Sequence, residues 1–276
     1  MNPIRINDFM VSNDDLVITN KIKTECAAPH GRLFQVLGVD NGRRVVKEIA
    51  CNTVVVGGAI TALENLTGAT ANWKPSTLNA TYGINAPVAS GTPKLALFGI
   101  GKGSANLDFG SYVDPNVKQK DILDPIPLRY CESVTGDDAS KYFMKVKNSD
   151  GITNSWYLKQ FSSTPIIKTC WKNSVNDETG TEILSGDIHE SQNTEGIETF
   201  TELQIDMNTF DGREYFEATG KLKEARYNTF GFYTGSYDPK TNEYADVRLY
   251  SAVAFNNRGL DLSSKSQFIY RIYSLI

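Results

Sequence analysis

The stretch Tyr244-Ala245-Asp246-Val247-Arg248-Leu249-Tyr250-Ser251 alternates between two sets of side chains with a period of two residues. Successive side chains of a β-strand point to opposite faces, so this period is typical of a strand with one buried face. Two similar stretches, at 226–237 and 266–276, flank it. We therefore expect the C-terminal run 224–276 to form three strands joined by two turns, a meander that closes the fold.

Upstream of this meander, short strand-like runs recur between clusters of turn residues. They lie at 94–100, 128–131, 141–147, 156–161, 166–171, 199–208 and 213–219. Many short strands separated by Gly, Asn, Asp or Pro favour an antiparallel β-sandwich or jelly roll. We therefore expect a mainly-β chain with one short helix, long ordered loops and a β-sandwich domain over residues 94–276.

Residues 1–68 are expected to form an N-terminal β-hairpin followed by the helix. Asn41-Gly42 between two apolar runs is a strong signal for a tight hairpin turn. A helix over 54–66 is predicted by the spacing of Val56, Ile60, Leu63 and Thr67, and Gly68 suits its C-terminal cap. Gly57-Gly58 near the helix start indicates close packing of the helix backbone against a sheet.

Residues 69–93 form the third expected segment, a long loop or arm. They are rich in Ala, Thr, Asn, Gly and Pro and show poor periodicity. A loop of this length in a folded domain is usually functional or a contact element. The apolar residues Trp73, Leu78, Tyr82, Ile84 and Val88 would be exposed in a monomer, whereas a partner surface would bury them.

Composition narrows the class of protein. The 276 residues carry a formal net charge of −4, which argues against nucleic acid as the main partner. We find no apolar run long enough to span a membrane and no secretory signal, so we expect folding in a reducing cytoplasm. The four cysteines include no Cys-x-x-Cys pair, which argues against a structural zinc site.

Motifs for catalysis and cofactors are weak. The glycine-rich run 99–104 lacks the Walker spacing and a following helical period, so it does not predict a nucleotide site. Asp187, His189 and Glu190 would give at most two metal ligands on one face of a strand. We expect no cofactor, no metal and no enzymatic activity. A hydrolase with two convergent carboxylates stays open as an alternative.

Tyrosines and phenylalanines are concentrated in the C-terminal meander. Most are expected to form core and cross-strand pairs. Tyr270 and Tyr273 fall on opposite faces of the final strand, so one of them is expected to contact another subunit, because tyrosine is enriched at interfaces. A tyrosine platform that binds sugar is the competing interpretation.

Four stretches together resemble a family of tailed-bacteriophage virion proteins. They are 94–101 with 125–130, then 226–235, 244–251 and the ending Ile269-Tyr270-Arg271-Ile272-Tyr273. The resemblance covers about two thirds of the chain and lies in packing motifs, so it carries over no enzymatic residues. It implies a structural protein of the virion, made in the cytoplasm of the host bacterium.

The resemblance and the residue patterns together predict non-covalent assembly in multiple copies, in the tail, baseplate or neck. The expected partners are other virion proteins, copies of the same chain and a surface glycan. The expected contact residues are Trp73, Tyr82, Ile84, Tyr270 and Tyr273. The alternatives are a glycan-binding or receptor-binding module of the particle and a capsid-associated decoration protein.

Overall fold

The chain divides into two units in the computed structural model, and both units collect segments that lie far apart in the sequence. The structure describes residues 9–12, 15–18, 30–40, 43–85, 91–103, 123–171, 197–260 and 264–274. Unit 1 comprises residues 1–51, 163–205 and 267–276, and unit 2 comprises residues 52–162 and 206–266. These units do not follow the expected segments 1–68, 69–93 and 94–276, because strands pair with partners from distant parts of the chain.

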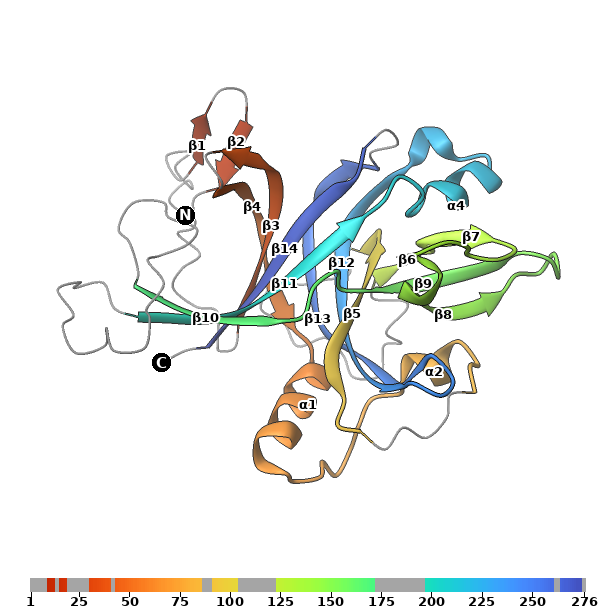
Figure 1. The fold of residues 1–276 in the computed structure, drawn as a ribbon, viewed down its shortest axis with the longest axis horizontal. Coiled ribbons are helices and arrows are strands. Elements are labelled where there is room, and N and C mark those ends of the chain that lie inside the picture. The colour runs from red at the N-terminus through yellow and green to blue at the C-terminus, as the bar shows by residue number, and fades with distance from the viewer. Residues whose placement is uncertain are drawn as a thin grey trace, which may run out of the picture. The chain divides into compact units, whose positions relative to one another are not determined.

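The sheet of unit 2 is built on a long antiparallel hairpin (Figure 1). Its strands are β12 (Arg226–Asp238) and β13 (Glu243–Gly259), as the sequence predicts. β5 (Lys94–Gly101) pairs with the other side of β12, and β9 (Asn154–Gln160) pairs with β5. β12 is therefore a central strand, which explains why ten consecutive residues of it are buried.

Three short strands also belong to this sheet. β6 (Pro125–Ile126) pairs with β5, while β7 (Arg129–Cys131) and β8 (Tyr142–Lys147) both pair with β9. One apolar core cluster includes Leu97, Leu158, Tyr233, Val247 and Leu249, each of which is at most 3% exposed. The core of unit 2 therefore lies on the strands that carry most of the alternating sequence pattern.

Helix α1 (Val56–Thr67) lies close to its predicted bounds and ends as predicted. Gly68 adopts a left-handed conformation with φ of 70°, and its N–H donates to the Glu64 carbonyl at 2.8 Å. The apolar spacing that predicts the helix does not mark its packed face, because Leu63 is 60% exposed whereas Gly57, Gly58 and Thr61 are buried. The helix therefore packs through its glycines.

Gly58 permits this close approach. A Cβ added to Gly58 would lie 2.0 Å from the carbonyl oxygen of Tyr250 on β13. The Val55 N–H at the helix start also donates to that Tyr250 oxygen, at 3.2 Å. The predicted packing of the Gly57-Gly58 backbone against a sheet is thus confirmed, and it turns the larger apolar side chains of the helix outward.

The loop at 69–93 contains a short helix, α2 (Leu78–Thr81). The Thr77 hydroxyl oxygen accepts from the Ala80 N–H at 3.1 Å and caps this helix. The side chain of Asn79 donates to the Tyr244 carbonyl at 3.0 Å and accepts from the Val247 N–H at 2.9 Å. It thus satisfies two backbone groups of β13 where the register with β12 shifts.

The strand expected at 213–219 is a helix, α4 (Arg213–Ala218), so this prediction is wrong. Gly212, with φ of 77°, precedes it, and Phe216 is fully buried. Arg213 and Glu217 form an ion pair at 2.7 Å across one helical turn. A short apolar run such as Tyr215-Phe216 does not distinguish a strand from one helical turn.

Unit 1 contains the predicted N-terminal hairpin of β3 (His30–Asp40) and β4 (Arg43–Val54). Beside β3 lies β14 (Ser266–Ser274), followed by β11 (Ile197–Met207) and β10 (Ile166–Trp171). The strand order β10-β11-β14-β3-β4 places β14 between two neighbours. β1 (Phe9–Ser12) and β2 (Asp15–Ile18) pair with each other.

The expected meander is only partly correct. β12 and β13 form its first hairpin, but β14 pairs with β3 through the register Tyr270↔Leu33 rather than with β13. Alternation defines which side chains share a face of a strand but not which strand is its neighbour. The broader prediction is confirmed: the chain is mainly β, its strands are antiparallel, helices are few, and the body is consistent with a β-sandwich.

Candidate functional site

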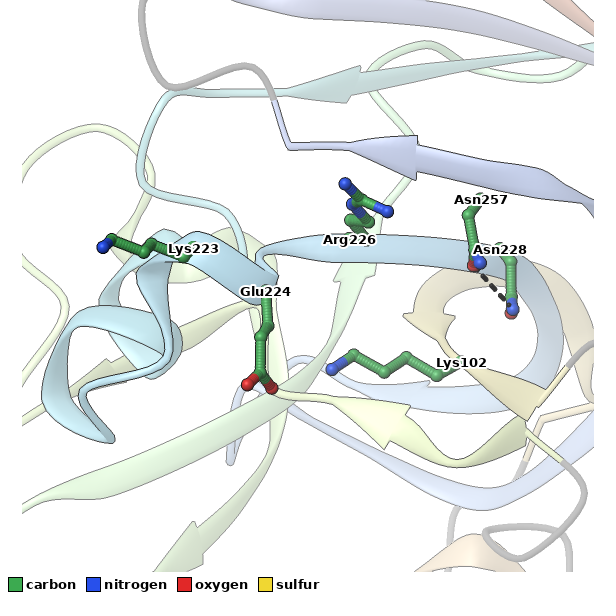
Figure 2. A pocket seen from close by; sticks show the side chains of 6 residues that line it. All are labelled: Lys102, Lys223, Glu224, Arg226, Asn228 and Asn257. Atoms are coloured by element: carbon green, nitrogen blue, oxygen red, sulfur yellow. Dashed lines mark hydrogen bonds between the residues drawn. The ribbon is translucent and has the colours of Figure 1, made fainter.

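A polar pocket of about 520 Å³ lies in unit 2 (Figure 2). Its walls come from the residue that follows β5, the short helix η6 (Leu222–Glu224), the start of β12 and the end of β13. The lining side chains are Lys102, Lys223, Glu224, Arg226, Asn228 and Asn257. The sequence patterns predict none of these residues as a site, since they are separated by up to about 155 positions in the chain and meet through the pairing of β5 with β12 and of β12 with β13.

The pocket is rich in positive charge. Three of its lining residues are cations and one is a carboxylate, although the whole chain has a net charge of −4. The Lys102 ammonium lies 4.6 Å from the centre of the Phe216 ring. Asn228 donates through Nδ2 to Oδ1 of Asn257 at 3.1 Å. This arrangement can attract a small anion and offer it hydrogen-bond donors.

A second polar cluster in unit 2 surrounds the carboxylate of Asp211, which is 2% exposed. Oδ1 accepts from the Tyr142 hydroxyl at 2.6 Å, and Oδ2 accepts from Lys159 at 2.8 Å and from the Asn208 N–H at 2.9 Å. Burial raises the pKa of Asp211, while the charge of Lys159 and these hydrogen bonds act against that increase. Burial and the neighbouring carboxylate also raise the pKa of Tyr142.

This cluster is best explained as a structural link between β8, β9 and the turn before α4. The side-chain amide of Asn208 also donates to Asp138 at 3.2 Å, so two carboxylates accept from one asparagine, Asp211 from its backbone and Asp138 from its side chain. A glycoside hydrolase needs such a pair in an accessible cleft. Asp211 is buried and has donors on both oxygens, so a substrate would not reach it in this arrangement.

A bidentate ion pair connects β7 to α4 nearby. Arg129 donates through Nε and Nη2 to the two carboxylate oxygens of Glu214, at 3.0 and 2.8 Å. The Tyr130 N–H donates to the same carboxylate at 2.9 Å. Burial acts to lower the pKa of Arg129, but Glu214 outweighs it and raises that pKa. These contacts hold α4 against the edge of the sheet, which is a structural role.

The predicted contact residues in the loop 69–93 have different surroundings. Tyr82 stacks on Tyr157 with ring centres 4.7 Å apart, and Ile84 packs against the core cluster of unit 2. Leu78 is 1% exposed. Trp73 is 45% exposed, and Val88 lies outside the described residues. Leu78, Tyr82 and Ile84 therefore pack on their own unit, whereas Trp73 keeps a ring surface available.

Tyr270 and Tyr273 on β14 are 0% and 3% exposed. The Tyr273 ring lies 5.3 Å from that of Phe200 and 5.0 Å from the Arg32 guanidinium. Gly31 faces the Tyr270 ring so closely that a Cβ there would lie 2.5 Å from its hydroxyl oxygen. The expectation that one of these tyrosines contacts another subunit therefore needs correction, since residues of the same unit bury both.

Apolar side chains are exposed together on helix α1. Leu63 and Leu66 are 60% and 82% exposed and lie one helical turn apart. Glu64 accepts from the Ala71 N–H at 2.8 Å and from Lys74 at 2.9 Å, which draws the segment containing Trp73 back to the helix. We refer to Leu63, Leu66 and Trp73 as the α1 surface.

The described residues also bear on metal and membrane sites. Among them, no group of three or more His, Cys, Asp or Glu side chains could hold a metal ion. Asp187, His189 and Glu190 lie outside the described ranges. None of the helices in the described part of the chain has the length and apolar character needed to cross a membrane.

Comparison of the chain with protein-family models, with curated proteins and with solved structures found no match.

Proposed function

We propose that this chain is a structural component of a tailed-bacteriophage particle, in its tail, baseplate or neck. In this proposal it assembles non-covalently in multiple copies, with copies of itself and with other virion proteins. It acts by binding its partners through complementary surfaces and not by catalysing a reaction. The observation that carries the proposal is the α1 surface, where Leu63 and Leu66 are exposed one helical turn apart and Trp73 is exposed in the segment that follows the helix.

The α1 surface has the character of an assembly contact. Burying a leucine side chain contributes about 1.5–3 kcal/mol, so leaving Leu63 and Leu66 in water forgoes a substantial stabilisation. Tryptophan is among the residues that contribute most at protein interfaces. The rigid packing of Gly57 and Gly58 on β13 holds these side chains outward, so a partner would meet a preformed surface.

The resemblance to virion proteins is supported by where its motifs lie. The stretches 94–101, 226–235 and 244–251 lie on β5, β12 and β13, which are consecutive neighbours in the sheet of unit 2. These three stretches therefore form one packed body, and the fourth, 269–273, lies on β14 in unit 1. The α1 helix packs on β13, so the proposed contact is mounted on that same body.

The alternatives differ in what the protein contacts. A glycan-binding module was suggested by the tyrosines of the meander, but those at 227, 233, 244, 250, 270 and 273 are buried, and Tyr237 is the exposed one of this set. A capsid-associated decoration protein would use the same α1 surface on a head. Mass spectrometry of separated heads and tails distinguishes that alternative from the proposal.

The test removes the α1 surface without touching the core. Particles are assembled with the double variant Leu66→Ser, Trp73→Ala, and the chain is quantified in purified particles by mass spectrometry. We expect incorporation to fall about tenfold or more, because each truncation removes an apolar contact worth about 1–2 kcal/mol at an interface.

The matched control is Ile152→Ser, which removes an apolar side chain that is 63% exposed in a turn. We expect this variant to enter particles at the level of the unaltered chain. Equal incorporation of the double variant and the control, with both proteins folded, would show that the α1 surface is not an assembly contact.

A further inference from the structure

The polar pocket of unit 2 has the composition of a ligand site and is separate from the α1 surface. Its volume of about 520 Å³ lies within the range of roughly 300–1,000 Å³ that is usual for small-molecule sites. Its lining combines charged groups of both signs with two amides. Such a lining suits a compact polar ligand rather than an apolar one.

Its charges are not neutralised by neighbours. In the described part of the chain, Lys102, Glu224 and Arg226 have no ion-pair partner within 4.0 Å. Figure 2 shows the Lys102 side chain extending toward the Glu224 carboxylate, with the ammonium group of Lys223 turned away from them. Cations that remain unpaired at a pocket are available to an anionic group of a ligand.

The two asparagines lie at the other end of the pocket from Glu224 (Figure 2). Asn228 is fixed because it donates to Asn257 at 3.1 Å and its oxygen accepts from the Thr229 hydroxyl at 2.8 Å. Among described residues, none accepts a hydrogen bond from the Asn257 amide nitrogen. That nitrogen can therefore donate to a ligand oxygen, while the Glu224 carboxylate can accept from a ligand hydroxyl.

These groups select between ligand classes. A bare anion would meet a cation but would leave the Glu224 carboxylate and the Asn257 amide unused. A neutral sugar would satisfy Glu224 and Asn257 but would leave the cations unused. A sugar that carries an acidic group satisfies both sets, with its hydroxyls at Glu224 and Asn257 and its anionic group at Arg226 or at Lys102, whose charged groups lie apart in Figure 2. We propose that this pocket binds an acidic sugar, a monosaccharide unit bearing a carboxylate or a phosphate.

The experiment measures binding to the full chain by isothermal titration calorimetry or ligand-detected NMR. The probes are glucuronic acid, glucose 6-phosphate, glucose and inorganic phosphate. We expect at least one acidic sugar to bind about tenfold more tightly than glucose and than phosphate, since each of these lacks one set of contacts. The two acidic probes report which anionic group the pocket prefers, and preference for either one supports the proposal.

Two variants attribute the binding to the pocket. Arg226→Gln and Lys102→Met each remove a cation, and the methionine retains an apolar stem against Phe216. At least one of them should weaken binding of the acidic sugar about tenfold, and that variant identifies the cation that meets the anionic group. The control, Lys240→Gln, removes a cation from the exposed turn between β12 and β13 and should leave binding unchanged.

Three results would overturn the proposal. One is the absence of binding by both acidic sugars to folded protein, and another is equal binding of glucose. The third is tight binding that both pocket variants retain, or that inorganic phosphate alone reproduces. Circular dichroism and thermal unfolding confirm that the variants are folded before binding is measured.

Discussion

Trp73, beside helix α1, and Tyr273, on strand β14, are both aromatic residues that the sequence assigns to contacts with other chains. Their surroundings differ sharply, because Trp73 is 45% exposed and Tyr273 is 3% exposed. Tyr273 packs against Phe200 and Arg32, which belong to its own unit. The α1 segment is held to unit 2 through glycines, which leaves its large side chains in water. An aromatic residue therefore indicates an interface only when its own fold leaves it uncovered.

The largest effect on stability is expected at β14. Arg271 is 1% exposed, pairs with Glu202 at 3.1 Å and lies 4.9 and 4.8 Å from the ring centres of Phe34 and Phe200. Arg271→Leu should lower the free energy of unfolding by about 3–5 kcal/mol, because it breaks a buried pair. Urea denaturation measures this loss.

The control for that experiment is Arg213→Leu, which breaks an ion pair that is 36% and 41% exposed. Its effect should stay below about 0.5 kcal/mol. If both arginine variants lose the same free energy, then β14 is not the tightly packed strand that the comparison requires.

The buried side of α1 should respond next. Gly58→Ala places a Cβ against the Tyr250 carbonyl oxygen, and we expect a loss of about 1–3 kcal/mol from overpacking. The control is Gly91→Ala, because an added Cβ there meets no atom within 4 Å. Thermal unfolding of both variants measures the difference. An unaffected Gly58→Ala variant would mean that α1 does not depend on close contact with β13.

The stability of unit 1 in acid is expected to depend on the ionised carboxylate of Glu202. Burial alone would raise the pKa of Glu202, but the hydrogen bond from Arg44 and the charge of Arg271 lower it below 4.5. A lowered pKa means that the stabilisation by Glu202 is present above pH 4.5 and is lost as the pH falls through the folded-state value.

We therefore expect the free energy of unfolding to decline less steeply on acidification in Glu202→Gln than in the unaltered chain. Urea denaturation at a series of pH values below 5 measures how steeply the free energy of unfolding falls with pH. The two proteins should differ by the contribution of one carboxylate whose pKa is lowered in the folded state. The double variant Leu66→Ser, Trp73→Ala carries no titrating change and should keep the original slope. The same slope in all three proteins would contradict the ionised state assigned to Glu202.

The smallest effect on stability is expected at the α1 surface. Leu66→Ser should change the free energy of unfolding by no more than about 0.5 kcal/mol, because its side chain is 82% exposed. Trp73→Ala should cost about 1 kcal/mol, because its side chain is 45% exposed and the covered part loses its contacts. Chemical denaturation of the purified chain checks this. A loss above 2 kcal/mol, judged against the usual size of surface effects, would show that these side chains support the fold and are not free for a partner.

Local signals account for the parts of the fold that the sequence predicts well. The alternation in 244–251 predicts β13, and Gly68 predicts the end of α1, because each depends on a few neighbouring residues. The partner of β14 is not predictable in this way, since its pairing with β3 joins residues about 240 positions apart. The role of Asn79 depends on a similar long-range contact with β13.

The candidate site was harder to predict than the fold. Lys102, Glu224 and Asn257 belong to separate turns and strand ends, and each looks like an ordinary surface residue in the sequence. Their proximity follows from the pairing of β5, β12 and β13. Of the five predicted contact residues, Trp73 alone is strongly exposed, because the loop around Tyr82 and Ile84 folds back on its own core. Exposure depends on that packing, which composition does not reveal.

The number of copies of this chain in intact particles tests the central claim most directly. Purified particles are analysed by quantitative mass spectrometry against a virion protein of known copy number. The account predicts that the chain co-purifies with particles in more than one copy and stays with the tail, baseplate or neck fraction after dissociation. Absence of the chain from washed, intact particles would contradict it.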